Sequence, residues 1–95
     1  MNKTLSLMGL ARKAGKLGIG HDVVFAAVRN GTAKAVILTS DASPRHAREL
    51  EAAGFSGRVI VTDADMDEAG HALGKRSCIF SVDDSGFAKA IEKTV

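Results

Sequence analysis

The chain has 95 residues, a formal net charge of +2, and 45% hydrophobic and 25% charged residues, which is the composition of a folded globular protein. Its length allows one domain, residues 1–95, with a single core, and excludes a two-lobed enzyme with a cleft between its lobes. Because no apolar stretch reaches the length of a membrane span, and Arg12 and Lys13 interrupt the N-terminal apolar run before a signal peptide is complete, we expect a cytoplasmic protein.

The first part of the chain predicts two helices that are separated by a short segment punctuated by glycines. Apolar residues at helical spacing predict a helix over residues 5–14, which Gly15 ends. Residues 16–19 are too few for more than a brief edge strand. A second helix is predicted over residues 21–30, directly after Gly20. The continuous apolar run 35–39 then predicts a central strand that is covered on both faces.

The rest of the chain continues the alternation of strands and helices. Ser43 as N-cap and Pro44 as the first helical residue predict a helix that reaches Gly54. The runs 58–62 and 78–82 predict two more buried strands, with Cys78 as an ordinary core residue of the second run. Helices are expected over the remaining segments, 65–73 and 85–93. This alternation predicts a three-layer α/β/α sandwich around a small, mixed, four-stranded sheet.

The start of the second predicted helix is the strongest candidate for an anion site. The first backbone N–H groups of a helix lack intrahelical acceptors and carry the positive end of the helix dipole, so a phosphate can dock there. Gly20 leaves room for that approach. The charge distribution agrees, because Asp22 is the only acid between Lys3 and Lys34. Three cations from the preceding turn are expected to steer phosphate toward this helix start: Arg12, Lys13 and Lys16.

Three strand-to-helix or helix-to-strand junctions are expected to converge on one edge of the sheet, where ligands of open α/β sheets tend to bind. They are residues 20–22, 40–43 and 74–77. The chain has neither Trp nor Tyr, so few aromatic side chains are available for RNA bases to stack on. This favours recognition of RNA shape and backbone. The candidate residues at these junctions are Gly20, His21, Asp22, Asp41, Ser43, Lys75, Arg76 and Ser77.

Catalysis is the weaker interpretation of the same residues. Asp41, Ser43 and His46 have the composition of a hydrolytic trio, but helix capping already accounts for Ser43, and no Gly-x-Ser-x-Gly elbow is present. The glycines around Lys16 and Gly20 match neither the P-loop nor the dinucleotide-binding fingerprint. We therefore predict that the chain is not an enzyme, and the sequence implies no cofactor.

The three histidines also predict no metal site. They fall on different predicted helices, and no cysteine or carboxylate is recognised at ligand spacing to them. The nearest approach to a metal-binding pair is Glu68 with His71. We therefore expect no metal site at His21, His46 or His71.

Several segments resemble the ribosomal protein L-seven-Ae superfamily, and most closely its small bacterial members. The matching segments are 10–17, Gly20, 27–28, 31–38, 40–44, 70–76 and 84–91, which together span nearly the whole chain. The resemblance implies the α/β/α sandwich. It also implies binding of kink-turn RNA, in which the start of the second helix grips tandem sheared G·A pairs and a later loop covers the bulged strand.

The superfamily motif of strong kink-turn binders is only partly present. In those binders the second helix starts with Gly, any residue, Asn and Glu, and a Lys follows three residues later. Here Gly20 matches, whereas Asp22, Val23 and Ala26 stand at the positions of Asn, Glu and Lys. An aspartate cannot donate to a guanine edge as an amide can, and a valine offers no carboxylate acceptor. The later loop, residues 74–77, is short and cationic.

The resemblance and the charge pattern together predict non-catalytic binding of structured, kink-turn-like RNA, either ribosomal or another noncoding RNA, with ribosomal proteins as further partners. The predicted contacts are the helix start at residues 20–22, the phosphate-steering Lys16 and Arg12, the loop residues Asp41 and Ser43, and a closing segment at 75–77. The alternative is a protein-interaction module on the same fold that has lost kink-turn recognition, which Val23 and Ala26 permit.

Overall fold

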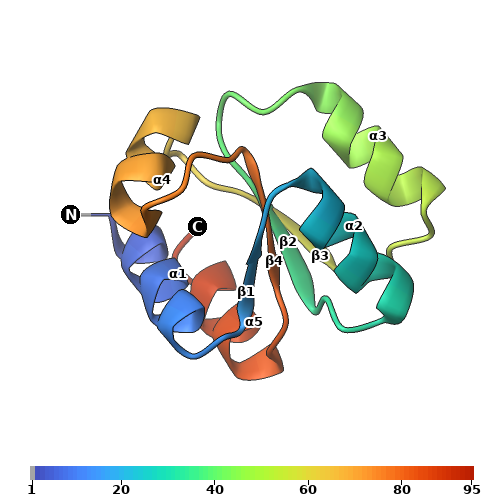
Figure 1. The fold of residues 1–95 in the computed structure, drawn as a ribbon, viewed down its shortest axis with the longest axis horizontal. Helices are drawn as coiled ribbons and strands as arrows, with labels where there is room; N and C mark the ends of the chain where they lie inside the picture. The colour runs from blue at the N-terminus through green and yellow to red at the C-terminus, as the bar shows by residue number, and fades with distance from the viewer. Residues whose placement is uncertain (1) are drawn as a thin grey trace.

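A computed structural model describes residues 2–95, in which five helices surround a four-stranded sheet (Figure 1). The helices are α1 (Lys3–Lys13), α2 (His21–Asn30), α3 (Pro44–Ala52), α4 (Met66–Leu73) and α5 (Ser85–Glu92). The strands are β1 (Leu17–Ile19), β2 (Ala35–Leu38), β3 (Arg58–Val61) and β4 (Ile79–Val82). Within the described residues, no helix is both long enough and apolar enough to cross a bilayer.

The sheet is mixed, and its strand order is β1-β4-β2-β3. Strand β4 runs antiparallel to both of its neighbours, with Leu17 opposite Val82 on one side and Ile37 opposite Phe80 on the other. Strands β2 and β3 run parallel, because α3 connects them as a crossover. The small mixed sheet predicted from the sequence is confirmed, and the segment at 17–19 is indeed a short edge strand.

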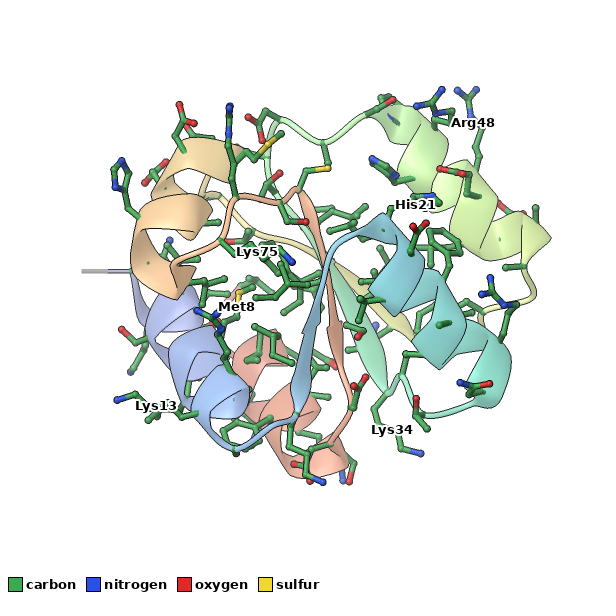
Figure 2. All side chains as sticks on the ribbon, in the orientation of Figure 1. Met8, Lys13, His21, Lys34, Arg48 and Lys75 are labelled. Atoms are coloured by element: carbon green, nitrogen blue, oxygen red, sulfur yellow. The ribbon has the colours of Figure 1, made fainter. Side chains whose placement is uncertain are left out.

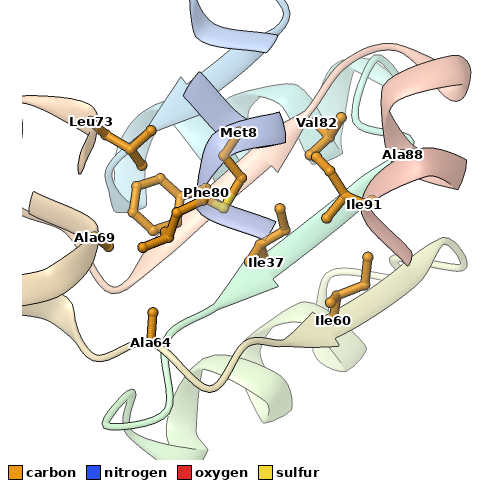
Figure 3. Close-up of a cluster of buried hydrophobic side chains, with 12 residues drawn as sticks. Met8, Ile37, Ile60, Ala64, Ala69, Leu73, Phe80, Val82, Ala88 and Ile91 are labelled. Carbon is orange, nitrogen blue, oxygen red and sulfur yellow. The ribbon is translucent and has the colours of Figure 1, made fainter. Parts of the chain in front are cut away.

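Helices cover both faces of the sheet and give the predicted three layers. On one face, α1, α4 and α5 close over a buried cluster that includes Met8, Leu73, Phe80 and Ile91 (Figure 3). On the other face, α2 and α3 pack over a second cluster. Its buried members are Val24, Phe25, Val36, Leu38, Leu50 and Ile79. Strands β2 and β4 are buried along their whole length, which is why their sequences are continuous apolar runs.

Strand β3 differs from the prediction of a buried strand over 58–62. It forms an edge of the sheet, and only Ile60 within it is buried. Because successive side chains of a strand point to opposite faces, Val59 and Val61 face away from the cluster that holds Ile60. Helix α3 lies on their side of the sheet but buries only Leu50, so Val61 remains 60% exposed. The prediction that this strand is buried on both faces was therefore wrong, because it relied on apolar composition alone.

Candidate nucleic-acid interface

The three predicted junctions meet at one end of the sheet. The antiparallel pairing places the end of β1, the end of β2 and the start of β4 together. Backbone hydrogen bonds continue beyond the strands there, from Gly20 N to Ile79 O at 3.2 Å and from Thr39 N to Cys78 O at 3.0 Å. Segments 20–22, 40–43 and 74–77 thus emerge from the same edge, at the top of the sheet in Figure 1. The predicted convergence of these segments is confirmed.

Helix α2 begins without a side-chain cap. Gly20 is its N-cap, with φ 103° and ψ 157°, a conformation that is essentially restricted to glycine. The first intrahelical bond runs from Val24 N to Gly20 O at 3.0 Å, and no side chain accepts from the amides before it. In contrast, the side chains of Asn2, Ser43, Asp65 and Asp84 cap the other four helices. The positive end of α2 therefore faces solvent, where an anion can reach it.

A shallow pocket of about 300 Å³ lies in front of this helix start, and Lys75 forms its far wall. The pocket is lined by Ile19, Gly20, His21, Asp22, Val23 and Lys75. The Asp22 side chain is fully exposed, and Val23 is 52% exposed although it is apolar. Figure 2 shows Lys75 on the loop that follows α4, between that helix and the strands. The pocket thus combines an amide-rich helix end, a cation and a small apolar surface.

The neighbours of Lys75 in the closing segment are engaged within the protein. Arg76 pairs with Asp67, with Nη2 and Oδ1 3.0 Å apart. The Ser77 hydroxyl donates to Ile79 O at 2.9 Å and also lies 3.2 Å from Ile79 N, where it acts as an acceptor. Arg76 is still 66% exposed and its ion pair is a surface one, which contributes little to stability. Arg76 is therefore held only by an exposed ion pair, whereas Ser77 has a structural role at the start of β4.

The three cations that precede Gly20 in the sequence do not form one cluster beside it. The Arg12 guanidinium donates to the carbonyl of Leu73 at the end of α4, which ties α1 to the loop that carries Lys75. Lys13 is exposed on the last turn of α1 (Figure 2). Lys16 stands at the opposite end of β1 from Gly20, about 13 Å along an extended chain. The expectation that Lys16 lies close to the helix start is corrected, because β1 separates the two.

Asp41 and Ser43 also have roles in holding loops and helices. The Ser43 hydroxyl accepts from Arg45 N at 3.3 Å and caps α3, as predicted. Asp41 Oδ1 accepts from Met66 N at 3.0 Å, so its carboxylate joins the loop after β2 to the start of α4. The His46 ring faces Cys78 and Glu49 instead of Ser43, so the geometry does not assemble the hydrolytic trio.

The Asp41 contact predicts an acid-dependent loss of stability. The Thr39 hydroxyl, followed by the backbone amides and Arg76, holds the pKa of the Asp41 carboxyl below its ordinary value of 3.8. Because the pKa is lower in the folded state, the stabilisation is fully present above pH 3.8 and is lost as pH falls through the folded-state pKa. The variant Asp41→Asn is expected to be less stable than wild type at neutral pH, and the gap should close in acid. Urea unfolding at a series of pH values measures this gap, and a gap that is constant with pH would contradict it.

Two of the three histidines come together with a carboxylate, although they lie on different helices. His21 Nε2 donates to Glu49 Oε2 at 3.2 Å, which holds the pKa of the Glu49 carboxyl below its ordinary value. The rings of His21 and His46 lie 5.9 Å apart, centre to centre. Cys78 is half-buried, with Sγ 3.4 Å from His46 Nε2, so it is not an ordinary core residue. The spacing of His46 and Glu49, one helical turn apart, was a signal that the sequence-based search missed.

Comparison with known proteins places this fold in a family. Residues 2–92 match the ribosomal protein L7Ae/L30e/S12e/Gadd45 family. The chain belongs to this family. An "RNA-binding protein YlxQ" from Enterococcus faecium is 30% identical, with 98% of this chain and 91% of that protein covered. A protein of the same name from Bacillus subtilis (strain 168) is 33% identical, over 90% of this chain and 87% of the relative. The resemblance inferred from the sequence motifs is confirmed.

The chain is also similar to a ribosomal protein and to two solved structures. The "large ribosomal subunit protein eL30" of Oryza sativa subsp. japonica is 32% identical over 90% of this chain and 80% of its own length. A Bacillus halodurans protein of unknown function superposes with a TM-score of 0.87 at 33% identity, covering 99% of this chain and 97% of that one. A Giardia lamblia 15.5kD RNA-binding protein shares the fold, with a TM-score of 0.74 at 17% identity over 95% of this chain and 79% of that one.

The family motif at the second helix can now be placed on the surface. Asp22 and Val23, which stand at the Asn and Glu positions of strong kink-turn binders, both line the pocket at the start of α2. Ala26, at the Lys position, is half-buried one turn further along the helix. The altered residues therefore lie at or beside the surface that the resemblance assigns to RNA. The pocket keeps the glycine and the exposed amides of the motif but has different side chains around them.

Proposed function

We propose that this chain binds structured RNA without catalysing a reaction, through the start of α2 and the loop at residues 74–77. The observation that carries the proposal is the uncapped N-terminus of α2, which faces solvent across a shallow pocket from Lys75. Backbone amides and a lysine together bind a phosphate without reading the base sequence. Membership of a family with RNA-binding and ribosomal relatives supports RNA as the source of that phosphate.

The proposed target is a kinked RNA, ribosomal or noncoding, in which closely spaced phosphates or an exposed base edge approach the helix start. The apolar side chain of Val23 offers a contact for a sugar or a base face beside the amides. Asp22 can accept from a base amino group at the place where an asparagine would both donate and accept. Kink-turn recognition by this chain thus rests on backbone amides, shape and phosphate contacts more than on the usual side chains. Ribosomal proteins are proposed as further partners on such an RNA.

The first test compares a kink-turn RNA with a fully paired duplex of equal length. Each is titrated with the purified protein at two salt concentrations, so that the electrostatic part of the affinity is separated from the rest. The proposal predicts tighter binding to the kinked RNA at both salt concentrations. Equal, weak binding to both would assign the protein to another RNA target. Absence of binding to either RNA would contradict the proposal and favour a protein-interaction module, for which Val23 supplies an exposed apolar contact.

Removal of the pocket lysine should weaken RNA binding through its charge. We expect Lys75→Ala to reduce the slope of log affinity against log salt by about 1, because one phosphate contact is lost. Lys89→Ala is the matched control, since Lys89 is an exposed lysine on α5, away from the pocket. Salt-dependent titrations of both variants against the kinked RNA make the measurement. An unchanged slope in Lys75→Ala, or an equal loss in Lys89→Ala, would remove Lys75 from the interface.

A further inference from the structure

A cluster of three metal-ligating side chains lies beside the start of α2, and its His21 also lines the pocket that holds Lys75. Glu49 on α3 stands between two imidazoles, one from the first residue of α2 and one from its own helix. His21 Nε2 is 3.2 Å from Glu49 Oε2, and His46 Nδ1 is 3.3 Å from Glu49 Oε1. One ligand atom from each of the three residues lies within 4.8 Å of the other two.

These separations come near the spacing of ligands around a tetrahedral metal ion. Zinc bonds to imidazole nitrogen and carboxylate oxygen are about 2.0–2.2 Å long, so two ligands of one tetrahedral ion stand about 3.3–3.6 Å apart. The nitrogens of His21 and His46 lie 3.2 and 3.3 Å from the two different oxygens of Glu49, and one ligand atom from each residue lies within 4.8 Å of the other two, so a shared ion would draw them closer together. The remaining approach requires a small movement of a side chain, and His21 is 46% exposed and free to make it. Phe25 supports the His21 ring from below, with ring centres 4.5 Å apart.

The internal hydrogen bonding of the cluster leaves a ligand position unsatisfied. The Nδ1 atom of His46 is buried and has no hydrogen-bond partner, although Glu49 Oε1 is near, because the alignment of the two groups does not make a bond. The other ring nitrogen of His46 lies 3.4 Å from Cys78 Sγ, which fixes the orientation of the ring. A buried ring nitrogen without a partner is costly, and this one lies 3.3 Å from Glu49 Oε1, where a metal ion could satisfy it.

The chemistry of the three ligands selects the kind of ion. Two imidazoles and one carboxylate are a set typical of zinc and of the other divalent transition metals, whereas Ca²⁺ and Mg²⁺ prefer sites made of oxygen alone. Three protein ligands leave the fourth position of a tetrahedral zinc ion for water. One carboxylate and two neutral imidazoles carry a charge of −1, so the site with a bound divalent cation would carry a net charge of +1.

We propose that His21, His46 and Glu49 form a binding site for Zn²⁺ or a similar divalent transition-metal ion, which joins the start of α2 to α3. Helix α3 has only one buried residue, Leu50, so a metal bridge would add a strong attachment where packing supplies little. The site needs no RNA and is tested without it, although it shares His21 with the proposed RNA interface. Bound metal stabilises the folded state by mass action, so the thermal midpoint should rise with the concentration of free Zn²⁺.

The test titrates the metal-free protein with Zn²⁺ by calorimetry and with Co²⁺ by visible absorption. We expect one ion per chain, the absorption bands of tetrahedral Co²⁺, and a thermal midpoint that rises with Zn²⁺. Affinity should fall at least tenfold in Glu49→Gln and in His21→Ala, both of which change exposed or half-exposed side chains and leave the core intact. His71→Ala is the matched control, because His71 is an exposed histidine on α4.

Three outcomes would overturn the proposal. The first is the absence of saturable binding by the wild-type protein. The second is binding that is unchanged in both Glu49→Gln and His21→Ala. The third is loss of metal binding in Cys78→Ser. Cys78 is not among the three proposed ligands, so this variant should keep the site. Loss of binding would mean that the Cys78 thiol, near His46, is itself a ligand of the metal. Retained binding in Cys78→Ser, with loss in the other two variants, would support the site as described.

Discussion

Replacement of Gly20 by alanine is expected to weaken binding of a kinked RNA by about tenfold or more. Gly20 has φ 103° and ψ 157°, and an alanine would pay about 1–3 kcal/mol to keep that conformation. Space is not the obstacle, because an added Cβ atom would have no neighbour within 4 Å. The backbone would relax to a conformation allowed for alanine, and the free amides of α2 would turn away from the pocket. Titration of the same kinked RNA with wild type and Gly20→Ala measures the effect.

A control separates backbone strain from the loss of the interface. Gly54 also has a positive φ, 77°, but it follows the end of α3, away from the pocket. Gly54→Ala should cost about 1 kcal/mol of stability and leave RNA affinity unchanged. If the two glycine variants lost RNA affinity equally, the effect would come from general destabilisation, and the assignment of Gly20 to the interface would fail.

Phe80→Ala is expected to cause the largest loss of stability, about 3–5 kcal/mol. Phe80 lies at the centre of β4, is completely buried, and packs in the cluster with Met8 and Leu73 (Figure 3). Removal of its ring leaves a cavity that strands and helices on this face cannot close without moving. The free energy of unfolding of such domains is about 5–15 kcal/mol in total, so the variant should be only marginally stable. The midpoint of urea unfolding should fall by more than about 1 M.

The comparison for Phe80 is a change on the exposed edge of the same sheet. Val61 is 60% exposed on β3, and Val61→Ala should change stability by no more than about 0.5 kcal/mol. A large effect there would show that something covers the edge strand in solution. A small effect of Phe80→Ala would mean that the core repacks around the lost ring, against the close packing that the structure shows.

Local patterns in the sequence were sufficient to predict the helices, the strands and the three layers. The continuous apolar runs of β2 and β4 predict buried central strands, and Ser43 with Pro44 predicts the start of α3 at the residue where it begins. Periodicity also placed α2 within its observed bounds. These features depend on neighbours in the chain, which is why a sequence is enough to infer them.

Features that depend on the order of strands or on long-range contacts were not accessible in the same way. The run of β3 is as apolar as a buried strand, and only its place at the sheet edge exposes Val61. Arg12 has the appearance of a free cation, but the packing of α1 on α4 brings its guanidinium to the Leu73 carbonyl. His21 and Glu49 meet because α2 and α3 share one face of the sheet. No pattern within either helix encodes that meeting.

The strand order also determines how early, during synthesis of the chain, the proposed RNA interface can form. Strand β1 pairs with β4 alone, so Leu17 has no partner until Val82 has been made. As the nascent chain leaves the ribosome, α1 and β1 emerge early and must wait, with the apolar side of α1 uncovered, while the remaining strands and helices are added. Pairings between segments so distant in the chain also slow folding. The pocket between Gly20 and Lys75 is therefore among the last parts to form, and a chain terminated before β4 would lack it altogether.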